Sequence, residues 1–458
     1  MPVPFSLPLR YNGFVRAFKE VFIFGLAAIF LTVNFVSPAR AGTAGPLPSL
    51  NKEQRNYFSA LYRDTWNYLG TFVEPLTGLP YDSSARQPAT SMTNAGLYLA
   101  SVAAAYRTEL IPKDEAAKRI EAALGSIAKV ETWRGIPRPW ILVKSLKPTF
   151  GDEFTYAPHL ASLIAGLLTA KSALPELAEK IDPLLLKMEL KSLYDPETGW
   201  LKGGYHVKTK TFAIYQPWGH WYYKYFASET RLLSFYLMAR RLVPAEHWAR
   251  LLRPIQEKEG EKFLVSGYEE AGLLTQYLPG IFLDERDTEM GGSQRAYARA
   301  QMKSAERIKA PVWGGSACTS PKGRYLTAGE LREDIVAPYA SVLTAIYFPK
   351  EAYENLKALE RLGARPSEIF PRHPERSEGS EILRVFDPQD DGSVSSRPVT
   401  FGFRDSLNWK TGEIAKVYLT VDQALIFLSL ANLLHEGAVW QTFAEEPAVQ
   451  KGLEILKE

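Results

Sequence analysis

Residues 401–434 read FGFRDSLNWKTGEIAKVYLTVDQALIFLSLANLL, a polar aromatic segment followed by a long apolar one. The part from Thr420 to Leu434 is apolar on nearly every face, which predicts a buried helix. Thr420 and Gln423 have the spacing of a capping box, and Asp422 in the first turn suits the helix dipole. For Asp422, a capping and dipole role and a role in ligand binding both remain open.

The segment from Phe401 to Trp409 carries Arg404, Asp405 and Asn408. A short polar loop among aromatic residues, directly before a buried helix, is typical of a pocket floor. Asp405 and Asn408 have no capping role that would explain them otherwise. We therefore predict that this loop contributes to a functional site.

Helical patterns dominate the rest of the chain, and no alternating run is long enough to predict a substantial sheet. We expect about twelve helices, which start near Lys52, Thr93, Pro112, His159, Pro175, Ser228, Pro244, Glu269, Gly291, Pro338, Lys350 and Thr420. Twelve helices in one all-α domain over residues 50–450 would suit a toroid of six helical hairpins. Another all-helical stack could give the same number.

The first 41 residues have the pattern of an export signal: a basic start, an apolar run over residues 21–35, and a small-x-small motif ending at Ala41. Residues 42–49 would then be a linker. Residues 1–41 hold four basic residues and one acidic residue, so their removal lowers the formal net charge from +3 to zero. We expect no nucleic-acid partner and no stable membrane insertion after cleavage.

The chain contains one cysteine, Cys318, which excludes an internal disulfide and a cysteine-built metal site. An exported protein without disulfides fits a periplasmic or secreted location. Residues 366–397 are polar and charged, and they predict a disordered surface insertion within the domain.

The two parts of the 401–434 stretch, FGFRDSLNW and YLTVDQALIFLSLAN, resemble the C-terminal signature of the glycoamylase-like family. TWNYL, TGLPYD and TNAGLYLAS match its opening segments in order. Members process glucans and also occur as domains of cyclic β-1,2-glucan synthases. The resemblance implies an (α/α)6 toroid, in agreement with the helix count, and an Asp-Gln pair that opens the last helix, here Asp422 and Gln423.

The densest aromatic segment runs from Tyr215 to Arg231 and includes Trp218, Trp221 and Tyr222, followed by Glu229. Ser228 would cap a helix with Glu229 in its first turn, where the family also has a Glu. This arrangement predicts a sugar platform beside a carboxylate. The alternative is a packed aromatic cluster with a Glu that suits the helix dipole.

A further run contains Trp313, Asp334 and Tyr339 and is similar to a family segment in which Trp-Gly, an Asp and Pro-x-Ala recur. Asp334 precedes Pro338, a residue favoured in the first helical turn. Asp334 would therefore lie at a helix mouth, either facing a pocket or capping the helix.

One departure from the family concerns residues 151–168. Related glucanases carry a Glu and then an Asp at this helix entry. Glu153 matches the Glu, but either Pro158 occupies the position of the Asp or that position has shifted. His159 follows, in a packing or a functional role. Earlier in the chain, Thr93 and Asn94 would cap the helix that follows them.

Glycoside hydrolysis normally needs two carboxyl groups. We predict an exported glycoside hydrolase that acts on a glucan or related envelope polysaccharide, with Glu229 as acid and Asp405 as base and with no cofactor or metal. The expected substrate-binding residues are Trp218, Trp221, Tyr222, Trp313, Asp334, Tyr339, Arg404, Asn408, Asp422 and Gln423.

Two alternatives remain. A non-catalytic protein on the same scaffold would bind glycan during polysaccharide synthesis or export, which the proline at position 158 favours. A lyase or isomerase acting on a uronate polymer would need a His or Tyr base, and the chain has six histidines. The sequence makes no prediction of the oligomeric state.

Overall fold

The computed structural model describes residues 45–149, 153–154, 157–207, 209–212, 221–265, 272–326, 334–367 and 399–457. These residues belong to one unit of the chain, residues 39–458. The predicted export signal, residues 368–397 of the predicted insertion, and Trp218 lie outside the described residues.

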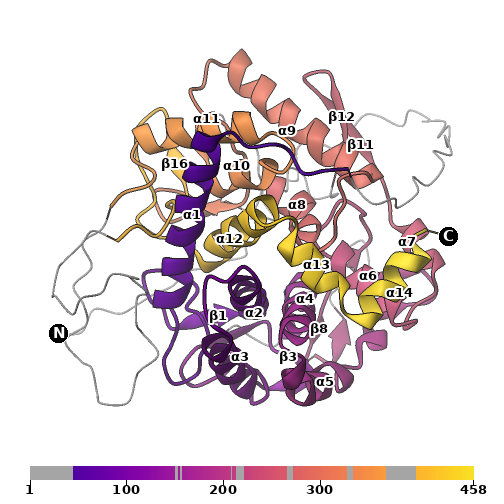
Figure 1. Cartoon of the computed structure of the whole chain (residues 1–458). Coiled ribbons are helices and arrows are strands. Elements are labelled where there is room, and N and C mark those ends of the chain that lie inside the picture. The colour runs from indigo at the N-terminus through magenta and orange to yellow at the C-terminus, as the bar shows by residue number, and fades with distance from the viewer. Residues whose placement is uncertain are drawn as a thin grey trace, which may run out of the picture. The chain divides into compact units, whose positions relative to one another are not determined.

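Helices make up most of the described chain (Figure 1). The α-helices are α1 Lys52–Thr71, α2 Met92–Arg107, α3 Lys113–Ile127, α4 Ala157–Ala173, α5 Ala178–Leu186, α6 Arg231–Ala239, α7 Glu246–Arg250, α8 Gly272–Phe282, α9 Glu289–Arg307, α10 Pro338–Thr344, α11 Pro349–Arg361, α12 Thr420–Leu434, α13 Ala438–Ala444 and α14 Pro447–Ile455. The expected helix-rich fold is confirmed.

The strands in the described parts of the chain have two to four residues, and they pair in small antiparallel sheets. The sheets are β1 Ala89–Ser91 with β4 Trp140–Leu142; β2 Thr132–Trp133 with β3 Ile136–Pro137; β5 Glu153–Phe154, β8 Tyr205–His206 and β9 Thr211–Phe212; β6 Tyr194–Asp195, β7 Trp200–Lys202 and β10 Tyr222–Tyr223; β11 Ile255–Lys258 with β12 Glu261–Leu264; β13 Cys318–Thr319 with β14 Tyr325–Leu326; and β15 Ile335–Val336 with β16 Leu407–Asn408. The prediction that no substantial sheet forms therefore holds for the described residues.

Helix α12 lies at the centre of the packing, as its apolar sequence predicts. It contacts α1, α2, α8, α10 and α13 (Figure 1). Helix α2 in turn packs on α4, and α4 packs on α6, whereas α10 packs on α8. Arg231 of α6 reaches α8, where its Nη2 donates to the Gln276 carbonyl at 3.3 Å. The described helices thus surround one shared apolar core.

Helices α2 and α4 approach each other backbone to backbone because each has a glycine at the crossing. A Cβ atom added at Gly96 would lie 2.2 Å from the carbonyl oxygen of Ser162, and one added at Gly166 would lie 2.0 Å from that of Gly96. Any larger side chain would force the two helices apart. This contact places the N-terminal part of α2 against the middle of α4.

The predicted helix starts agree closely with the structure. Lys52, Pro338 and Thr420 are the first residues of α1, α10 and α12. The predicted start near Ser228 lies three residues before Arg231, the first residue of α6, and α13 and α14 were not predicted. The predicted start at Glu269 lies outside the described residues.

Three predicted caps are wrong. The N-cap of α12 is Leu419 and has no side-chain hydrogen bond, while the Thr420 hydroxyl donates to the carbonyl of Tyr81 instead. Ser91 caps α2 through the backbone N–H of Asn94, so neither Thr93 nor Asn94 is the capping residue. In the third case, Thr230 rather than Ser228 stands at the N-cap of α6 and makes no capping bond.

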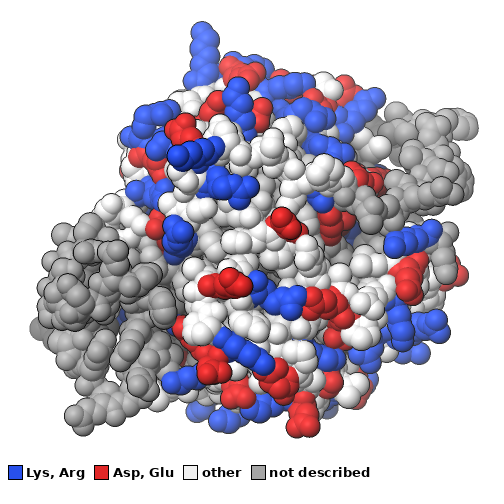
Figure 2. Space-filling model, viewed as in Figure 1, with Lys and Arg blue, Asp and Glu red and all other residues white. Residues whose placement is uncertain are grey.

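Charges of both signs are interspersed over the face of the molecule shown in Figure 2, as expected for a chain with little net charge. None of the helices in the described ranges combines the length and the apolar character that crossing a membrane requires.

Candidate functional site

The site predicted from residues 401–409 is built on a glycine. Gly402 has a φ of +85°, in the left-handed region that favours glycine. A Cβ atom here would lie 2.5 Å from Gln423 Oε1 and 2.9 Å from Thr65 Cγ2. Gln423 Nε2 donates to the carbonyl of Phe403 at 2.8 Å. These contacts hold the segment that carries Asp405 against the first turn of α12.

Asp405 is fully buried, with 0% of its surface exposed. Its Oδ2 accepts a hydrogen bond of 2.7 Å from the backbone N–H of Thr319 in β13, and the hydroxyl of Ser406 donates to the carbonyl of Thr319. Apart from the carboxyl group of Asp422, no N–H or O–H group of the described residues donates to Asp405 Oδ1. One oxygen of this carboxyl is therefore fixed, and the other is left with unused capacity to accept.

Asp422 in the first turn of α12 faces Asp405, and the two carboxyl groups interact by a hydrogen bond. Burial raises the pKa of Asp405 to about 6, and burial together with the charge of Asp405 raises the pKa of Asp422 well above its usual value. Two buried carboxylates cannot both ionise cheaply at such close range. The pair therefore keeps a proton at a pH at which isolated aspartates have lost theirs.

A third carboxyl group, Asp82, acts on both of these aspartates by charge repulsion. Its Oδ1 accepts a 2.8 Å hydrogen bond from Asn94 Nδ2, and its backbone carbonyl accepts from the N–H of Thr420 at 2.9 Å. Burial raises its pKa as well. We call Asp82, Asp405 and Asp422 the carboxylate cluster.

Glu229 lies directly before α6 rather than in its first turn. It is partly exposed, and its Oε2 accepts a 3.2 Å hydrogen bond from the hydroxyl of Ser228. Burial raises the pKa of Glu229. A backbone hydrogen bond, the hydrogen bond from Ser228 and the positive charge of Arg231 lower this pKa and only partly offset the effect of burial.

Tyr325 connects Glu229 with the cluster. Its phenol has a pKa above the usual value because protein atoms crowd it and because Asp405, Asp422 and Glu229 all repel its ionised form. Three carboxyl groups from two distant parts of the chain therefore lie within electrostatic reach of one hydroxyl. These three predicted site residues therefore lie near one another.

Asp334 and Asn408 form a separate polar pair beside β15 and β16. Asn408 Nδ2 donates to Asp334 Oδ2 at 3.3 Å, and the Asp334 carbonyl accepts from the N–H of Trp409 at 2.9 Å. Asn408 Oδ1 accepts from the N–H groups of Lys410 and Thr411, both at 3.0 Å, so it also shapes the local turn.

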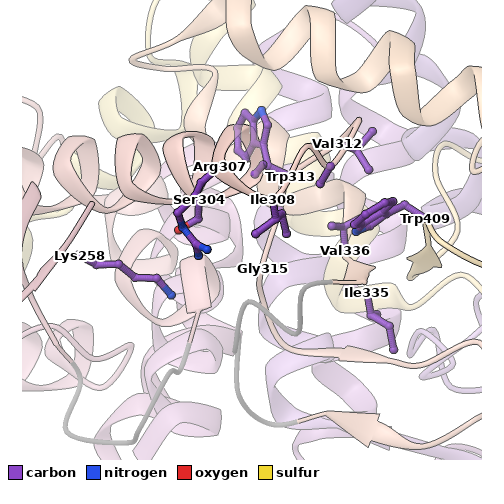
Figure 3. Close-up of a pocket in the computed structure, with 13 residues that line it drawn as sticks. Lys258, Ser304, Arg307, Ile308, Val312, Trp313, Gly315, Ile335, Val336 and Trp409 are labelled. Carbon is purple, nitrogen blue, oxygen red and sulfur yellow. The ribbon is translucent and has the colours of Figure 1, made fainter. Parts of the chain in front are cut away.

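A small pocket lies beside this pair, and Trp313 belongs to its lining. Figure 3 shows Lys258 and Arg307 on one side of the pocket and Trp409 with Ile335 on the other. Its volume is about 50 Å³, whereas ligand pockets are usually about 300–1,000 Å³. Arg307 Nε already donates to Glu259 Oε1 at 2.8 Å. This pocket is therefore too small to hold a sugar ring.

Three other predicted binding residues make structural contacts. The hydroxyl of Tyr339, which is 1% exposed, bonds at 2.8 Å both to Ser316 Oγ and to the Ala317 carbonyl. The guanidinium of Arg404 lies 4.4 Å from the ring centre of Tyr418. Gln423 is 0% exposed and holds Phe403, as described above.

Trp221 and Tyr222 do not form one platform. Trp221 contacts Tyr223, with ring centres 5.4 Å apart, whereas the hydroxyl of Tyr222 donates to Asp195 Oδ2. Neighbouring residues on a strand point to opposite faces, which explains the separation. The carboxylate of Asp195 contributes, after burial, to raising the pKa of Tyr222 to about 12.

The first turn of α4 lacks the acidic residue that related glucanases carry, as the sequence indicated. Pro158 lies in the first turn, which contains no acidic residue. His159 Nδ1 bonds to the hydroxyl of Thr93 at 2.9 Å, and burial lowers the pKa of His159 to about 4. This imidazole is therefore neutral near pH 7. Glu153 lies in β5 opposite His206.

The sequence patterns did not single out Asp82, Tyr325 or Thr319 as site residues. Asp82 ends the TGLPYD motif, and Tyr325 follows Arg324 within a run that was similar to the family. The motifs that contain Asp82 and Tyr325 could be recognised in the sequence. The contacts that join these residues and Thr319 to Asp405 and Asp422 span 80 or more positions, and local patterns do not predict them.

Comparisons with known proteins bear on this arrangement. Residues 60–241 match the family model DUF3131, which is described as a protein of unknown function. A stretch of 256 residues is 29% identical to the cyclic β-(1,2)-glucan synthase NdvB of Rhizobium meliloti (strain 1021). That stretch is 52% of this chain but 8% of the synthase.

Solved structures share the fold over nearly the whole chain. A glucoamylase candidate from Bacteroides fragilis NCTC 9343 has a TM-score of 0.69 and 19% identity, covering 90% of this chain and 99% of that one. The endo-β-1,2-glucanase of Chitinophaga pinensis, in complex with sophorotriose and glucose, has a TM-score of 0.67 and 16% identity, covering 89% and 98%. The resemblance to glucan-processing proteins of glycoamylase type is confirmed. The fold of this chain is thus the one seen in glucoamylase-type and glucanase structures.

Proposed function

We propose that this protein is a glycoside hydrolase that cleaves β-1,2-linked glucan. The observation that carries the proposal is the convergence of Glu229, Asp405 and Asp422 around the phenol of Tyr325. Hydrolysis of a glycosidic bond needs an acid and a base on either side of the bond, and Glu229 and Asp405 are placed to supply them. The β-1,2 linkage is proposed because the similar synthase and glucanase are named for it.

Glu229 is proposed as the general acid. It is partly exposed, so that a substrate can reach it, and burial raises its pKa, which favours the protonated form that an acid needs. Its proton would pass to the glycosidic oxygen as the bond to the anomeric carbon breaks.

Asp405 is proposed as the general base. Its Oδ2 is fixed by Thr319, and its buried Oδ1 accepts from no described group other than the Asp422 carboxyl, so Oδ1 can take a proton from a water that the substrate brings beside it. The water oxygen then bonds to the anomeric carbon. Asp422 retains the proton of the coupled pair, which leaves Asp405 as the ionised partner near neutral pH.

We further propose that the helices form the (α/α)6 toroid of the glycoamylase-like family. The serial packing of α2, α4 and α6 and of α8, α10 and α12 supports this arrangement. Residues near the N-terminal ends of α2, α6 and α12 supply the proposed site. On the N-terminal sequence pattern, we also propose export to the periplasm or exterior, which N-terminal sequencing of the mature protein would test.

A second candidate is a glycan-binding protein without catalysis. The absence of an acid from the first turn of α4, where Pro158 stands, supports it. If the catalytic acid or base of related glucanases is the Asp at that position, this chain lacks it.

Reducing-end release separates these two functions. The purified chain would be incubated with β-1,2-, β-1,3-, β-1,4- and α-1,4-linked glucans, and binding would be followed in parallel by calorimetry. We expect turnover of the β-1,2-linked glucan and a loss of about 10²- to 10⁴-fold in Glu229→Gln and in Asp405→Asn, with folding retained. Glu259→Gln, at an exposed ion pair, serves as the matched control.

Binding without turnover in the wild-type protein would favour the second candidate. Unchanged turnover in both amide variants would show that hydrolysis does not use these carboxyl groups.

A further inference from the structure

Tyr325 is unusual among the tyrosines near the site because it is 56% exposed. The buried hydroxyl of Tyr339 is bonded to Ser316 and Ala317, and that of Tyr68 to Thr420. The Tyr325 hydroxyl makes no hydrogen bond with the described residues. An exposed aromatic ring with an unused hydroxyl is suited to meet a ligand with both apolar and polar groups.

The backbone places Tyr325 beside the proposed base. In the hairpin of β13 and β14, Tyr325 pairs directly with Thr319, the residue whose N–H holds Asp405. Side chains that are opposite each other in an antiparallel pair have Cβ atoms roughly 4.5–5.5 Å apart and share a face. The hairpin that fixes Asp405 therefore also presents the phenol.

The hairpin is anchored in two ways. Thr319 is bonded through both its N–H and its carbonyl to residues 405 and 406, and the N–H of Ser320 donates to the carbonyl of Arg324 at 2.7 Å to close the turn. The position of Tyr325 relative to the carboxylate cluster is thus set by hydrogen-bonded backbone and not by side-chain packing alone.

From this geometry we infer that Tyr325 is a substrate-contacting residue, with its ring against a sugar face and its hydroxyl donating to a sugar oxygen next to the bond that is cleaved. This inference rests on the proposed function and adds a residue to it. Protein atoms around the hydroxyl, and after them the neighbouring carboxylates, raise the pKa of the phenol, so it keeps its proton and remains a donor across the working range of pH.

Two substitutions separate the hydroxyl from the ring. Tyr325→Phe removes the donor and keeps the ring, whereas Tyr325→Ala removes both. Tyr353→Phe is the matched control, because that hydroxyl bonds to Glu53 at the surface, between α11 and α1. The kcat and KM for β-1,2-linked gluco-oligosaccharides, the pH–rate profile and the melting temperature would be measured for each variant.

We expect Tyr325→Phe to lower kcat/KM by about 10- to 100-fold, as expected for a lost hydrogen bond in the transition state. The melting temperature and the shape of the pH–rate profile should stay unchanged, because the phenol does not titrate there. Tyr325→Ala should lower kcat/KM further and raise KM, because the platform is lost too. The control should match the wild-type protein.

Wild-type kinetics in both Tyr325 variants would overturn the inference and leave the proposed hydrolase intact. A changed pH–rate profile in Tyr325→Phe would also overturn it, because the residue would then act through the carboxylates. If the wild-type protein binds glucan without cleaving it, the hydrolase proposal is contradicted, but the inference about Tyr325 is not. The inference is then judged by binding, where Tyr325→Ala should weaken affinity at least tenfold. If the wild-type protein neither binds nor cleaves, both proposals fall.

Discussion

Two regions of the molecule bury acidic side chains, and they do so in opposite ways. Glu285 is paired with Arg231, which is 0% exposed; Arg231 Nε donates to Oε1 at 2.9 Å and Nη2 to Oε2 at 2.8 Å. Gln294 Nε2 adds a 3.0 Å bond to Oε2. In the carboxylate cluster, Asp405 and Asp422 face each other, and their partners are neutral donors and a further acid.

The contrast separates a structural use of charge from a functional one. A buried carboxylate beside an arginine stays ionised and ties two segments together, here α6 and the residues after α8. Buried carboxylates beside one another hold a proton at the cost of folding stability. A strongly perturbed pair of this second kind, close to an exposed phenol, is typical of an active site.

The largest effect is expected from breaking the arginine pair. Glu285→Gln should lower the free energy of unfolding by about 3–5 kcal/mol, because it leaves the guanidinium of Arg231 buried without its counter-charge. Urea unfolding at pH 7 would measure the loss. The double variant Arg231→Met with Glu285→Leu should regain much of it. A loss below about 1 kcal/mol in Glu285→Gln would mean that water solvates the arginine.

A change of opposite sign is expected in the cluster. The raised folded-state pKa values mean that the native protein binds more protons than the unfolded chain, whose aspartates titrate near pH 3.9. The contribution of Asp405 to stability is therefore complete below about pH 4 and is lost as the pH rises from there through about 6, and that of Asp422 is lost at higher pH. Asp422→Asn should remove the part of the slope that Asp422 itself causes and be more stable than the wild-type protein at pH 8.

Urea unfolding between pH 4 and pH 8 would measure how the free energy of unfolding of each protein depends on pH. The free energies of unfolding of the two proteins should converge near pH 4. If Asp422→Asn is the less stable protein at pH 8, the ionised form of Asp422 contributes to the fold, and the cluster resembles the arginine pair more than we infer.

The smallest effect concerns the glycine that supports the cluster. Gly402→Ala should cost about 2 kcal/mol, from its left-handed φ and the contacts with Gln423 and Thr65. Gly412→Ala is the matched control: its φ is +74° and no atom lies within 4 Å of the added Cβ, so it should cost only about 1 kcal/mol. Equal costs in thermal unfolding would show that the contact with Gln423 adds nothing.

Local sequence patterns predicted the helices well. The bounds of α12 agree with the prediction because its apolar residues leave no polar face for a solvent-exposed helix. Prolines and caps gave most of the other starts to within three residues. The caps themselves were less predictable. The Thr420 hydroxyl bonds to Tyr81, which is remote in sequence, and the Asn94 side chain bonds to Asp82 in the preceding loop, so neither side chain caps its own helix.

The candidate site was predictable only in part. Asp405 and Glu229 stood out because each acid lies in a polar aromatic segment before an apolar helix. Asp82 and Tyr325 did not, because their importance lies in contacts made across the fold. The burial of Arg231 could not be predicted. Its buried charge is balanced by Glu285, which lies 54 positions later, and no local pattern links the two residues.

The carboxylate cluster joins residue 82 to residues 405 and 422, and the N–H of Thr420 bonds to the carbonyl of Asp82. A ribosome that has made the first 400 residues has therefore made Glu229, Tyr325 and most of the helices, yet neither of the paired aspartates. During synthesis the proposed hydrolase must stay inactive until its final helices emerge. Loss of the chain from residue 405 onward, by early termination or proteolysis, would leave a fragment without its proposed base.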